Sequence, residues 1–164
     1  MVITLLGEST QDDMKKLISS IKKYPNSYLE MSEEFKNNSL LAFTAVKAKP
    51  KLFYNIPAEL QNNPKIAFEA IKRIPAILKE CYILKENREF ITKLFNENRN
   101  PEFLEFISSN IKDDWSFMKP FVTENFNNLR FCSSNIRNSE QIILDLVEDS
   151  IQKNVKINGR SAFI

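Results

Sequence analysis

Apolar residues recur along the chain with a fixed period, and a set of prolines marks that period. Pro25, Pro50 and Pro75 are separated by 25 residues each, Pro101 follows after 26, and Phe126 takes the same place 25 residues later. Three columns of apolar residues follow these anchors, with a one-residue deletion in the third copy: Tyr28, Phe53, Leu78, Leu104 and Leu129; Met31, Ile56, Cys81, Ile107 and Cys132; Phe35, Leu60, Leu84, Ile111 and Ile136. Three columns in one register indicate a tandem repeat.

The second half of each copy predicts an amphipathic helix that begins at a capping residue. A polar pair opens this half, and its second member is Asn, Asp or Ser in all five copies: Asn38, Asn63, Asn87, Asp114 and Ser139. Side chains of these types accept hydrogen bonds from the free N–H groups at a helix start. Apolar residues then recur with helical spacing, as Leu41, Ala42, Ala45 and Val46 do in the first copy. The next anchor proline ends the helix.

The first half of each copy predicts a two-turn helix followed by a tighter turn. Pro57 lies inside this half of the second copy, so we expect that helix to be kinked or split there. Before the first anchor, Asp12 and Asp13 match the capping pair, and residues 1–24 therefore resemble a degenerate copy. After the last copy, residues 151–164 match no column, and Asn158–Gly159 predicts a turn.

Two short helices cannot enclose a core, but stacked copies can bury their apolar faces on one another. We therefore expect an all-α fold, a right-handed-type α-solenoid of about six 25-residue helix-pair repeats. The whole chain, residues 1–164, would form one repeat domain. Its parts would be the degenerate repeat 1–24, the repeats 25–49, 50–74, 75–100, 101–125 and 126–150, and a C-terminal cap or tail at 151–164.

The amino-acid composition excludes several kinds of catalytic and ligand-binding site. The chain has no histidine, so a Ser-His-Asp or Cys-His relay and an imidazole-ligated metal are excluded. Its two glycines, Gly7 and Gly159, cannot build a glycine-rich phosphate loop. Cys81 and Cys132 form no CxxC pair and occupy a core column, so we expect buried, inert thiols. The 23 basic and 21 acidic residues give a net charge of +2, which provides no polyanion-binding signal.

Hydrophobic residues make up 43% of the chain, as in a soluble globular protein, but no apolar run approaches the roughly 20 residues that cross a bilayer. The apolar segment Met1–Gly7 lacks a basic leader and a small-residue cleavage site. These features favour a soluble, cytoplasmic protein without membrane contacts. A signal read by a specialised secretion system would escape these rules.

Two segments carry a resemblance to a known family. The sequence SEEFKNN at Ser32–Asn38 and the sequence AELQNNPKIAFEAIK at Ala58–Lys72 resemble the domain-of-unknown-function family four-one-one-six (DUF4116). The resemblance covers residues 25–150 and is clearest in the second copy. It implies tandem helical repeats and, in some members, an effector that intracellular bacterial pathogens secrete into a host cell. It supplies no catalytic residue.

Three aromatic residues are candidates for binding a protein partner. Trp115 directly follows a helix cap, where the other copies have Ser39, Pro64, Arg88 and Glu140, so the position should face water. Phe106 and Phe131 share a column in which the earlier copies have polar residues. An exposed Trp flanked by aromatic residues is a common interface anchor. The alternatives are that the Trp115 ring folds down over a neighbouring repeat, and that the core widens in the later repeats or residues 151–164 cover the aromatic pair.

A basic stripe offers a second candidate surface. Lys36, Lys85, Lys112 and Arg137 recur once per repeat, with Gln61 in the second copy. Such a column can follow an RNA backbone. Cations near a helix C-terminus also offset the helix dipole, and we favour that explanation. Asp113 and Asp114 could hold a divalent cation, although helix capping accounts for Asp114.

These observations favour a non-catalytic scaffold that mediates protein–protein interaction. We expect a monomer without cofactor, metal or enzymatic activity, whose partner is a protein and not a nucleic acid. The effector resemblance implies that this partner belongs to a host. Two other functions stay open: an RNA-binding repeat array, and an accessory region of a larger enzyme.

Overall fold

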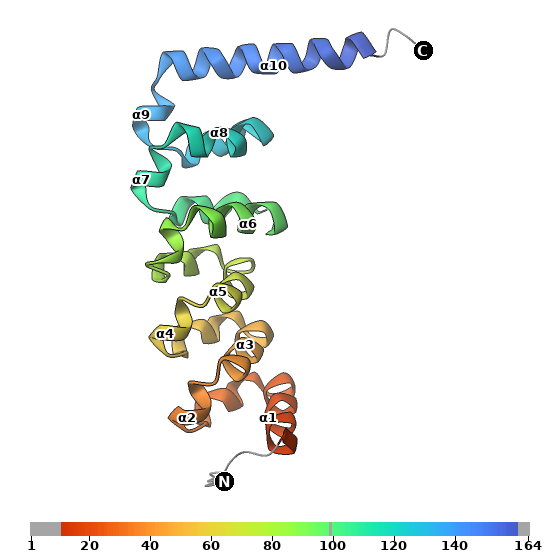
Figure 1. The fold of residues 1–164 in the computed structure, drawn as a ribbon, viewed down its shortest axis with the longest axis vertical. Coiled ribbons are helices and arrows are strands. Elements are labelled where there is room, and N and C mark those ends of the chain that lie inside the picture. The colour runs from red at the N-terminus through yellow and green to blue at the C-terminus, as the bar shows by residue number, and fades with distance from the viewer. Residues whose placement is uncertain (1–10, 99, 161–164) are drawn as a thin grey trace. The chain divides into compact units, whose positions relative to one another are not determined.

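The computed structural model describes residues 11–98 and 100–160, with side chains described through Gln152. Over these residues the chain consists of helices joined by short turns and contains no strand, which confirms the all-α class. The chain divides into two compact units, Met1–Ile107 and Ser108–Ile164. Figure 1 labels the helices of both, and each unit is described by itself.

The first unit begins with a single helix and continues with repeats of one pattern. Each repeat has a six-residue 3₁₀ helix that starts at an anchor proline, a short helical turn, and a longer α-helix. The elements are α1 (Gln11–Lys23); η1 (Pro25–Glu30), α2 (Glu33–Lys36) and α3 (Ser39–Ala48); η2 (Pro50–Asn55), α4 (Ala58–Gln61) and α5 (Pro64–Ile71); η3 (Pro75–Glu80), η4 (Leu84–Glu86) and α6 (Arg88–Asn98); and η5 (Pro101–Phe106).

The second unit follows the same order. It contains α7 (Ser109–Lys112), α8 (Trp115–Glu124), η6 (Phe126–Phe131), α9 (Ser134–Arg137) and α10 (Glu140–Arg160). Phe126 takes the place of the anchor proline at the start of η6, so the ring of proline is not needed for that turn. Pro120 lies inside α8, where it removes one backbone donor from the helix.

The first half of each repeat differs from the prediction. A tight 3₁₀ helix comes first and a single α-turn follows, which is the reverse of the expected order. The break between them was expected at Pro57, but every repeat has it. Met31, Ile107 and Cys132 adopt extended backbone at the equivalent position without a proline beside them. In these three repeats the apolar residue six positions after the anchor has extended backbone, and the 3₁₀ helix ends there.

The predicted caps of the longer helices are confirmed. The Asn38 Oδ1 accepts hydrogen bonds from the N–H groups of Leu40 and Leu41, at 3.0 and 3.2 Å. Equivalent bonds run to Asn63, Asn87, Asp114 and Ser139. The pair at Asp12 and Asp13 is an exception, because both residues lie in the first turn of α1 rather than before it. Carboxylates there still favour the helix dipole.

The column three residues after the anchors forms the centre of the core. Tyr28, Phe53, Leu78 and Leu104 are fully buried. The fifth repeat departs from this arrangement because Leu129 is half-buried, while the neighbouring Asn128 is buried like its counterparts Leu52, Ile77 and Phe103. The Asn128 Nδ2 donates a hydrogen bond of 2.9 Å to the carbonyl oxygen of Phe121, which satisfies this buried amide donor.

Both cysteines are buried free thiols, as predicted. Burial raises the pKa of Cys81 to about 12, with a smaller contribution from Glu80, and raises that of Cys132 to about 11. A thiol with so high a pKa holds little thiolate at neutral pH, so neither cysteine is an activated nucleophile.

Helix packing within the first unit follows the size of the inward residues. The helices α1, α3 and α5 pack side by side in chain order (Figure 1). Ala42 and Ala45 of α3, and Ala67 and Ala70 of α5, are fully buried. Such small side chains allow two helix axes to approach closely.

Hydrogen bonds also join successive repeats of the first unit. The Arg73 Nη1 donates to the carbonyl oxygen of Lys47 at 3.3 Å, and Ile83 N–H donates to the Asn62 Oδ1 at the same distance. Asn62 is the first member of a capping pair whose second member, Asn63, caps α5. The pair therefore serves two repeats at once.

The first half of the third repeat, from its anchor proline to its cap, is one residue shorter than in the others, and the deletion falls in its short turn. The stretch Leu84–Glu86 forms a three-residue 3₁₀ helix where the other repeats have a four-residue α-turn. Leu84 is still buried, and Asn87 still caps α6 through Phe90 N–H at 2.9 Å. The core position and the cap thus keep their places despite the deletion.

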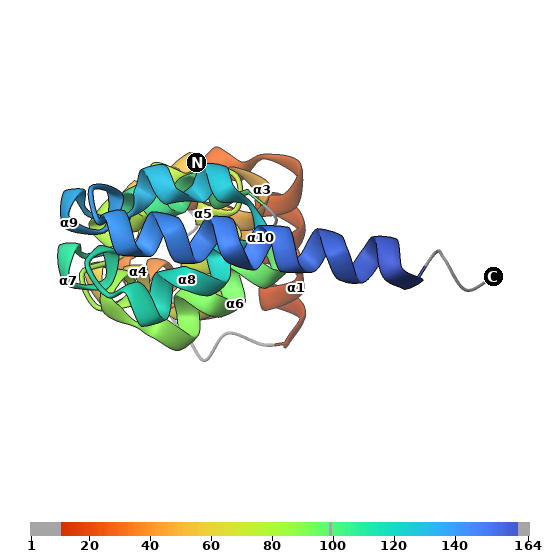
Figure 2. The same cartoon turned by 90° about the horizontal axis from the view of Figure 1, so that it is seen from above.

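The end of the second unit corrects another prediction. Residues 151–160 continue α10, which runs to Arg160 as one helix (Figure 2). The turn expected at Asn158–Gly159 is absent from this helix. Residues 161–164 lie outside the described part of the chain.

Candidate functional site

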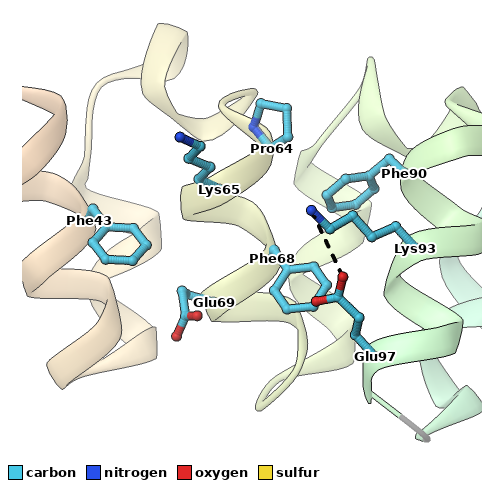
Figure 3. Close-up of a pocket in the computed structure, with 8 residues that line it drawn as sticks. All are labelled: Phe43, Pro64, Lys65, Phe68, Glu69, Phe90, Lys93 and Glu97. Atoms are coloured by element: carbon cyan, nitrogen blue, oxygen red, sulfur yellow. Dashed lines mark ion pairs between the residues drawn. The ribbon is translucent and has the colours of Figure 1, made fainter.

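A groove with a cavity volume of about 290 Å³ opens on the first unit, across α3, α5 and α6. Figure 3 shows its lining, which combines three aromatic rings with charged side chains: Phe43, Phe68 and Phe90; Lys65, Glu69, Lys93 and Glu97; and Pro64. We refer to these eight residues as the aromatic groove. All eight belong to one compact unit.

Two of the rings occupy a position that the core does not require. Phe43 and Phe68 each lie five residues after the cap of their helix, and both are half-buried. The third repeat has the exposed Thr92 at that position. Phe90 is different, because it is only 6% exposed and belongs to the apolar stripe of α6. The groove thus has a core residue at one wall and two partly exposed rings along the other helices.

Lysines cover the partly exposed rings. The Lys47 Nζ lies 5.7 Å from the centroid of the Phe43 ring, and the Lys72 Nζ lies 5.9 Å from that of Phe68. Both pairs are spaced i, i+4, so one helix turn sets each contact. At this distance the cation is attracted to the face of the ring.

Ion pairs border the groove on two helices. The Lys72 Nζ also lies 2.8 Å from the Glu69 Oε2, whose side chain is only 14% exposed. This ammonium group partners the Glu69 carboxylate, so the carboxylate is compensated although it is partly buried. On α6, the Lys93 Nζ lies 3.9 Å from the Glu97 Oε1, and both side chains are exposed (Figure 3). The second pair is free to exchange partners, because exposed ion pairs gain little from their own contact.

The lining of this groove offers both apolar and charged contacts. Its rings can contact apolar groups, and its lysines and carboxylates can pair with charges of either sign. The described residues contain no group of three or more His, Cys, Asp or Glu side chains arranged to hold a metal ion.

The three aromatic candidates from the sequence lie in different surroundings. Phe131 is 6% exposed, so it contributes to the core of the second unit rather than to an exposed patch. The side chain fills the core of the fifth repeat, where Leu129 does not. Phe106, in the first unit, is half-buried, and the Lys79 Nζ lies 4.8 Å from its ring centroid. Trp115 is the first residue of α8 and is half-buried in the second unit.

The basic candidates end short helical elements. Lys36, Lys85, Lys112 and Arg137 lie in the last turns of α2, η4, α7 and α9. The Lys36 Nζ lies 3.0 Å from the Glu33 Oε1, and the Lys85 Nζ lies 4.7 Å from the Tyr82 ring centroid. A last-turn position is where a cation offsets the helix dipole, as the favoured interpretation requires.

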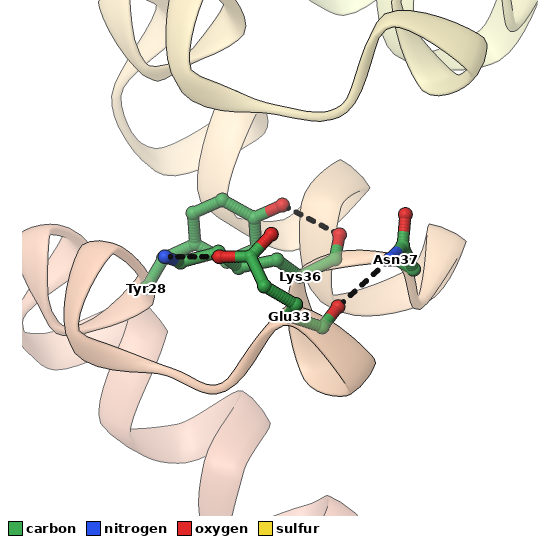
Figure 4. Close-up of polar contacts among 4 residues, drawn as sticks. All are labelled: Tyr28, Glu33, Lys36 and Asn37. Atoms are coloured by element: carbon green, nitrogen blue, oxygen red, sulfur yellow. Dashed lines mark hydrogen bonds and ion pairs between the residues drawn. The ribbon is translucent and has the colours of Figure 1, made fainter.

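Figure 4 shows how the end of α2 is held. The buried Tyr28 hydroxyl donates a 2.7 Å hydrogen bond to the carbonyl oxygen of Lys36, and the Asn37 Nδ2 donates to that of Glu33. Burial raises the pKa of Tyr28 to about 12, and the charge of Glu33 raises it further in the same direction. The backbone of Lys36 is therefore a structural acceptor, fixed by a core tyrosine.

The two aspartates considered as a cation site have donors within the protein. Asp114 accepts from Phe117 N–H at 3.1 Å as the cap of α8. Asp113 accepts from the Ser133 hydroxyl, and from the Asn135 Nδ2 at 3.2 Å, both in the next repeat. Asp113 therefore joins two repeats of the second unit.

Sequence reasoning did not single out Phe43 and Phe68. Both lie one position beyond the apolar stripe that identifies the longer helices. The candidate residues predicted from the sequence lie at other positions of the repeat. The available signal is that two successive repeats carry the sequence Phe-x-x-x-Lys at the same place, where later repeats carry Thr92 and Lys119. An aromatic residue next to the stripe, repeated with a lysine one turn later, marks the groove.

Comparison with known protein families gives a match to part of the chain. The model of the family described as Domain of unknown function (DUF4116) matches residues 87–137. Comparison with curated proteins and with solved structures gives no match. No helix in the described part of the chain is long and apolar enough to cross a membrane.

The matched segment begins at the cap of α6 and ends at the last residue of α9. It therefore covers about two of the 25-residue periods, counted from a longer helix rather than from an anchor proline. The resemblance seen in the sequence was clearest in the second copy, outside this segment, but its full range of 25–150 includes the match. Residues 87–137 are thus similar to the DUF4116 family.

Proposed function

We propose that the chain is a non-catalytic helical-repeat scaffold that binds another protein through the aromatic groove. The repeats would form a right-handed α-solenoid, and the ligand would be a short segment that carries an apolar side chain flanked by charged residues. The apolar side chain would contact Phe43 and Phe68. The charged residues would pair with Lys93 and Glu97, which are exposed and only loosely paired with each other.

One observation carries this proposal: Phe43 and Phe68 keep part of their rings exposed at a position where later repeats do without an aromatic residue. A ring that the core does not need, on a concave surface bordered by charges, is the usual composition of a peptide-binding groove. The chain also has no histidine, which excludes Ser-His-Asp and Cys-His relays.

The proposal can be tested with a phage-displayed peptide library selected on the immobilised chain. Peptides that bind the wild type should lose at least about tenfold in affinity for the Phe68→Ala variant, because truncated interface aromatics commonly cost more than 1 kcal/mol. The matched control is Tyr54→Ala, which removes a half-exposed ring outside the groove. Affinity for that control should equal that of the wild type.

Loss of binding in Trp115→Ala but not in Phe68→Ala would overturn the groove in favour of the patch that the sequence suggested. The effector context rests on the family resemblance alone, and a pull-down from host-cell lysate tests it. The wild type should retain a host protein that the Phe68→Ala variant does not. Retention of the same proteins by both variants would contradict the proposed site.

A further inference from the structure

We infer that the protein segment bound in the aromatic groove is acidic, with carboxylates beside its apolar side chain, and that Lys47 and Lys65 select those carboxylates. This inference rests on the proposed function, because it names the chemistry of the ligand at the same site. Three features of α3, α5 and α6 support it: the balance of charges at the groove, the partners that these charges already have, and the distance of the lysines from the rings.

The groove and the lysines over its rings carry more positive than negative charge. Together they hold four ammonium groups and two carboxylates: those of Lys47, Lys65, Lys72 and Lys93, and those of Glu69 and Glu97. A ligand with a net negative charge would balance this excess, whereas a basic ligand would add to it. The sign of the excess therefore favours an acidic segment.

Both carboxylates of the groove already have a lysine. The Lys72 Nζ lies 2.8 Å from the Glu69 Oε2, and the Glu69 side chain is only 14% exposed, so little of this carboxylate is open to a ligand. On α6, the Lys93 Nζ lies 3.9 Å from the Glu97 Oε1, and this pair carries no net charge. A basic ligand would have to displace a lysine at either carboxylate.

Lys47 and Lys65 have no such partner. Both residues are exposed, and neither forms an ion pair with another residue in the described part of the chain. Lys65 precedes Glu69 by one turn of α5 (Figure 3), but that carboxylate pairs with Lys72 instead. A lysine that precedes a glutamate at this spacing gains less from the contact than one that follows it. The ammonium group of Lys65 is therefore free to bind a carboxylate of the ligand.

Both lysines lie close to a ring that an apolar side chain of the ligand would contact. The Lys47 Nζ lies 5.7 Å from the centroid of the Phe43 ring. Lys65 lines the groove three residues before Phe68 on α5, and residues at that spacing are neighbours on a helix surface. A carboxylate bound by either lysine would thus bring the next apolar side chain of the same segment beside a ring.

A protein segment suits this arrangement better than a nucleic acid. The backbone of a nucleic acid carries a negative phosphate at every nucleotide, and a strand in the groove would pass the carboxylates of Glu69 and Glu97. The net charge of +2 on the whole chain adds little attraction for a polyanion. A peptide can instead place its carboxylates at Lys47 and Lys65 alone, with an apolar residue between them.

The probe for this inference is the best-binding peptide from the display selection, synthesised with a fluorescein label. Fluorescence anisotropy at physiological ionic strength should show at least about tenfold weaker binding when its Asp and Glu are replaced by Asn and Gln. Lys47→Glu and Lys65→Glu should each weaken binding of the acidic peptide about fivefold and leave the neutral peptide unaffected. The matched control is Lys51→Glu, which reverses an exposed charge of η2 outside the groove lining and should bind like the wild type.

Failure of this inference and failure of the proposed function give different results. Selected peptides without an excess of Asp and Glu, whose binding is still lost in Phe68→Ala, would keep the groove as the site and overturn its acidic preference. A selection that returns no peptide dependent on Phe68 would overturn both. A labelled single-stranded oligouridylate that displaces the acidic peptide, and that Lys65→Glu no longer binds, would assign the surface to a nucleic acid instead.

Discussion

The helices α5 and α6 begin with the same kind of cap and bury the same columns, but they present residues of very different size to the core. α5 buries Ala67 and Ala70 where α6 buries Ile91 and Leu94. α5 packs extensively against α3, which is also faced with alanine, and the aromatic groove opens toward α6. The comparison teaches that a repeat can keep its pattern while the volume of two side chains sets how closely neighbouring helices approach.

The largest loss of stability should come from removing a buried side chain of α6. Leu94→Ala should lower the free energy of unfolding by about 2–5 kcal/mol, because Leu94 is fully buried and its removal leaves a cavity. Urea denaturation followed by far-UV circular dichroism measures the change. A loss below about 1 kcal/mol would show that α6 collapses onto α5 and that the side-chain volume does not hold the groove open.

Overfilling α5 is the reciprocal experiment. Ala70→Leu should lower the free energy of unfolding by about 1–3 kcal/mol, because a fully buried alanine leaves no room for three further carbon atoms. The same denaturation measurement applies, with Ala48→Leu as the control, since Ala48 is exposed at the end of α3. Equal stability of Ala70→Leu and the control would mean that the close approach of α3 and α5 is not required.

Removing the cap should cost about the same stability in an alanine-faced helix as in α6. Asn38→Ala in alanine-faced α3 and Asn87→Ala in α6 should each cost about 1 kcal/mol, because each Oδ1 accepts from free N–H groups at the helix start. A difference above about 1 kcal/mol between the two variants in thermal or urea unfolding would show that the packing of the helix determines what its cap contributes.

The smallest effect is expected at alkaline pH, at the junction between α5 and α6. The Cys81 Sγ lies 3.6 Å from the carbonyl oxygen of Gln61, and burial raises its pKa from 9.0 to about 12. Between these values the unfolded chain releases a proton that the folded chain keeps, so stability falls as the pH rises above 9. By pH 9.5 the loss should reach about 0.8 kcal/mol.

The variant Cys81→Ala should weaken this dependence when urea denaturation is repeated at pH 8 and pH 10. Tyr28, whose pKa is raised from 10.0 to about 12, adds a similar loss only above pH 10. An equally steep decrease in Cys81→Ala would assign the alkaline sensitivity to other groups.

Much of the local structure could be predicted from single residues because it is set by local chemistry. Asn38 and Asp114 cap their helices in any context that leaves the first N–H groups free, and a proline restricts the turn that it begins. The order of the 3₁₀ helix and the α-turn could not be predicted in this way. Both turns place an apolar residue inward at nearly the same spacing, and the choice depends on the extended residue between them.

The aromatic groove could not be predicted from any single column of the repeat. The exposure of Phe43 and Phe68 depends on how far apart α3, α5 and α6 lie, and that spacing depends on the alanines of one pair of helices and the larger residues of the next. The buried position of Phe131 similarly accompanies a half-buried Leu129, whose column is fully buried in the earlier repeats. In both cases the exposure of an aromatic residue depends on residues in other columns of the repeat.

The short turn of the third repeat has a consequence for how this sequence can vary in length. The third repeat has one residue fewer between Cys81 and Asn87 than the other repeats have at the same place. Leu84 is nevertheless buried, and Asn87 still caps α6. Insertions and deletions should therefore be tolerated at this turn in every repeat, while the same change inside a longer helix would rotate all later side chains by about 100°. Searches for related sequences should therefore allow gaps at that turn.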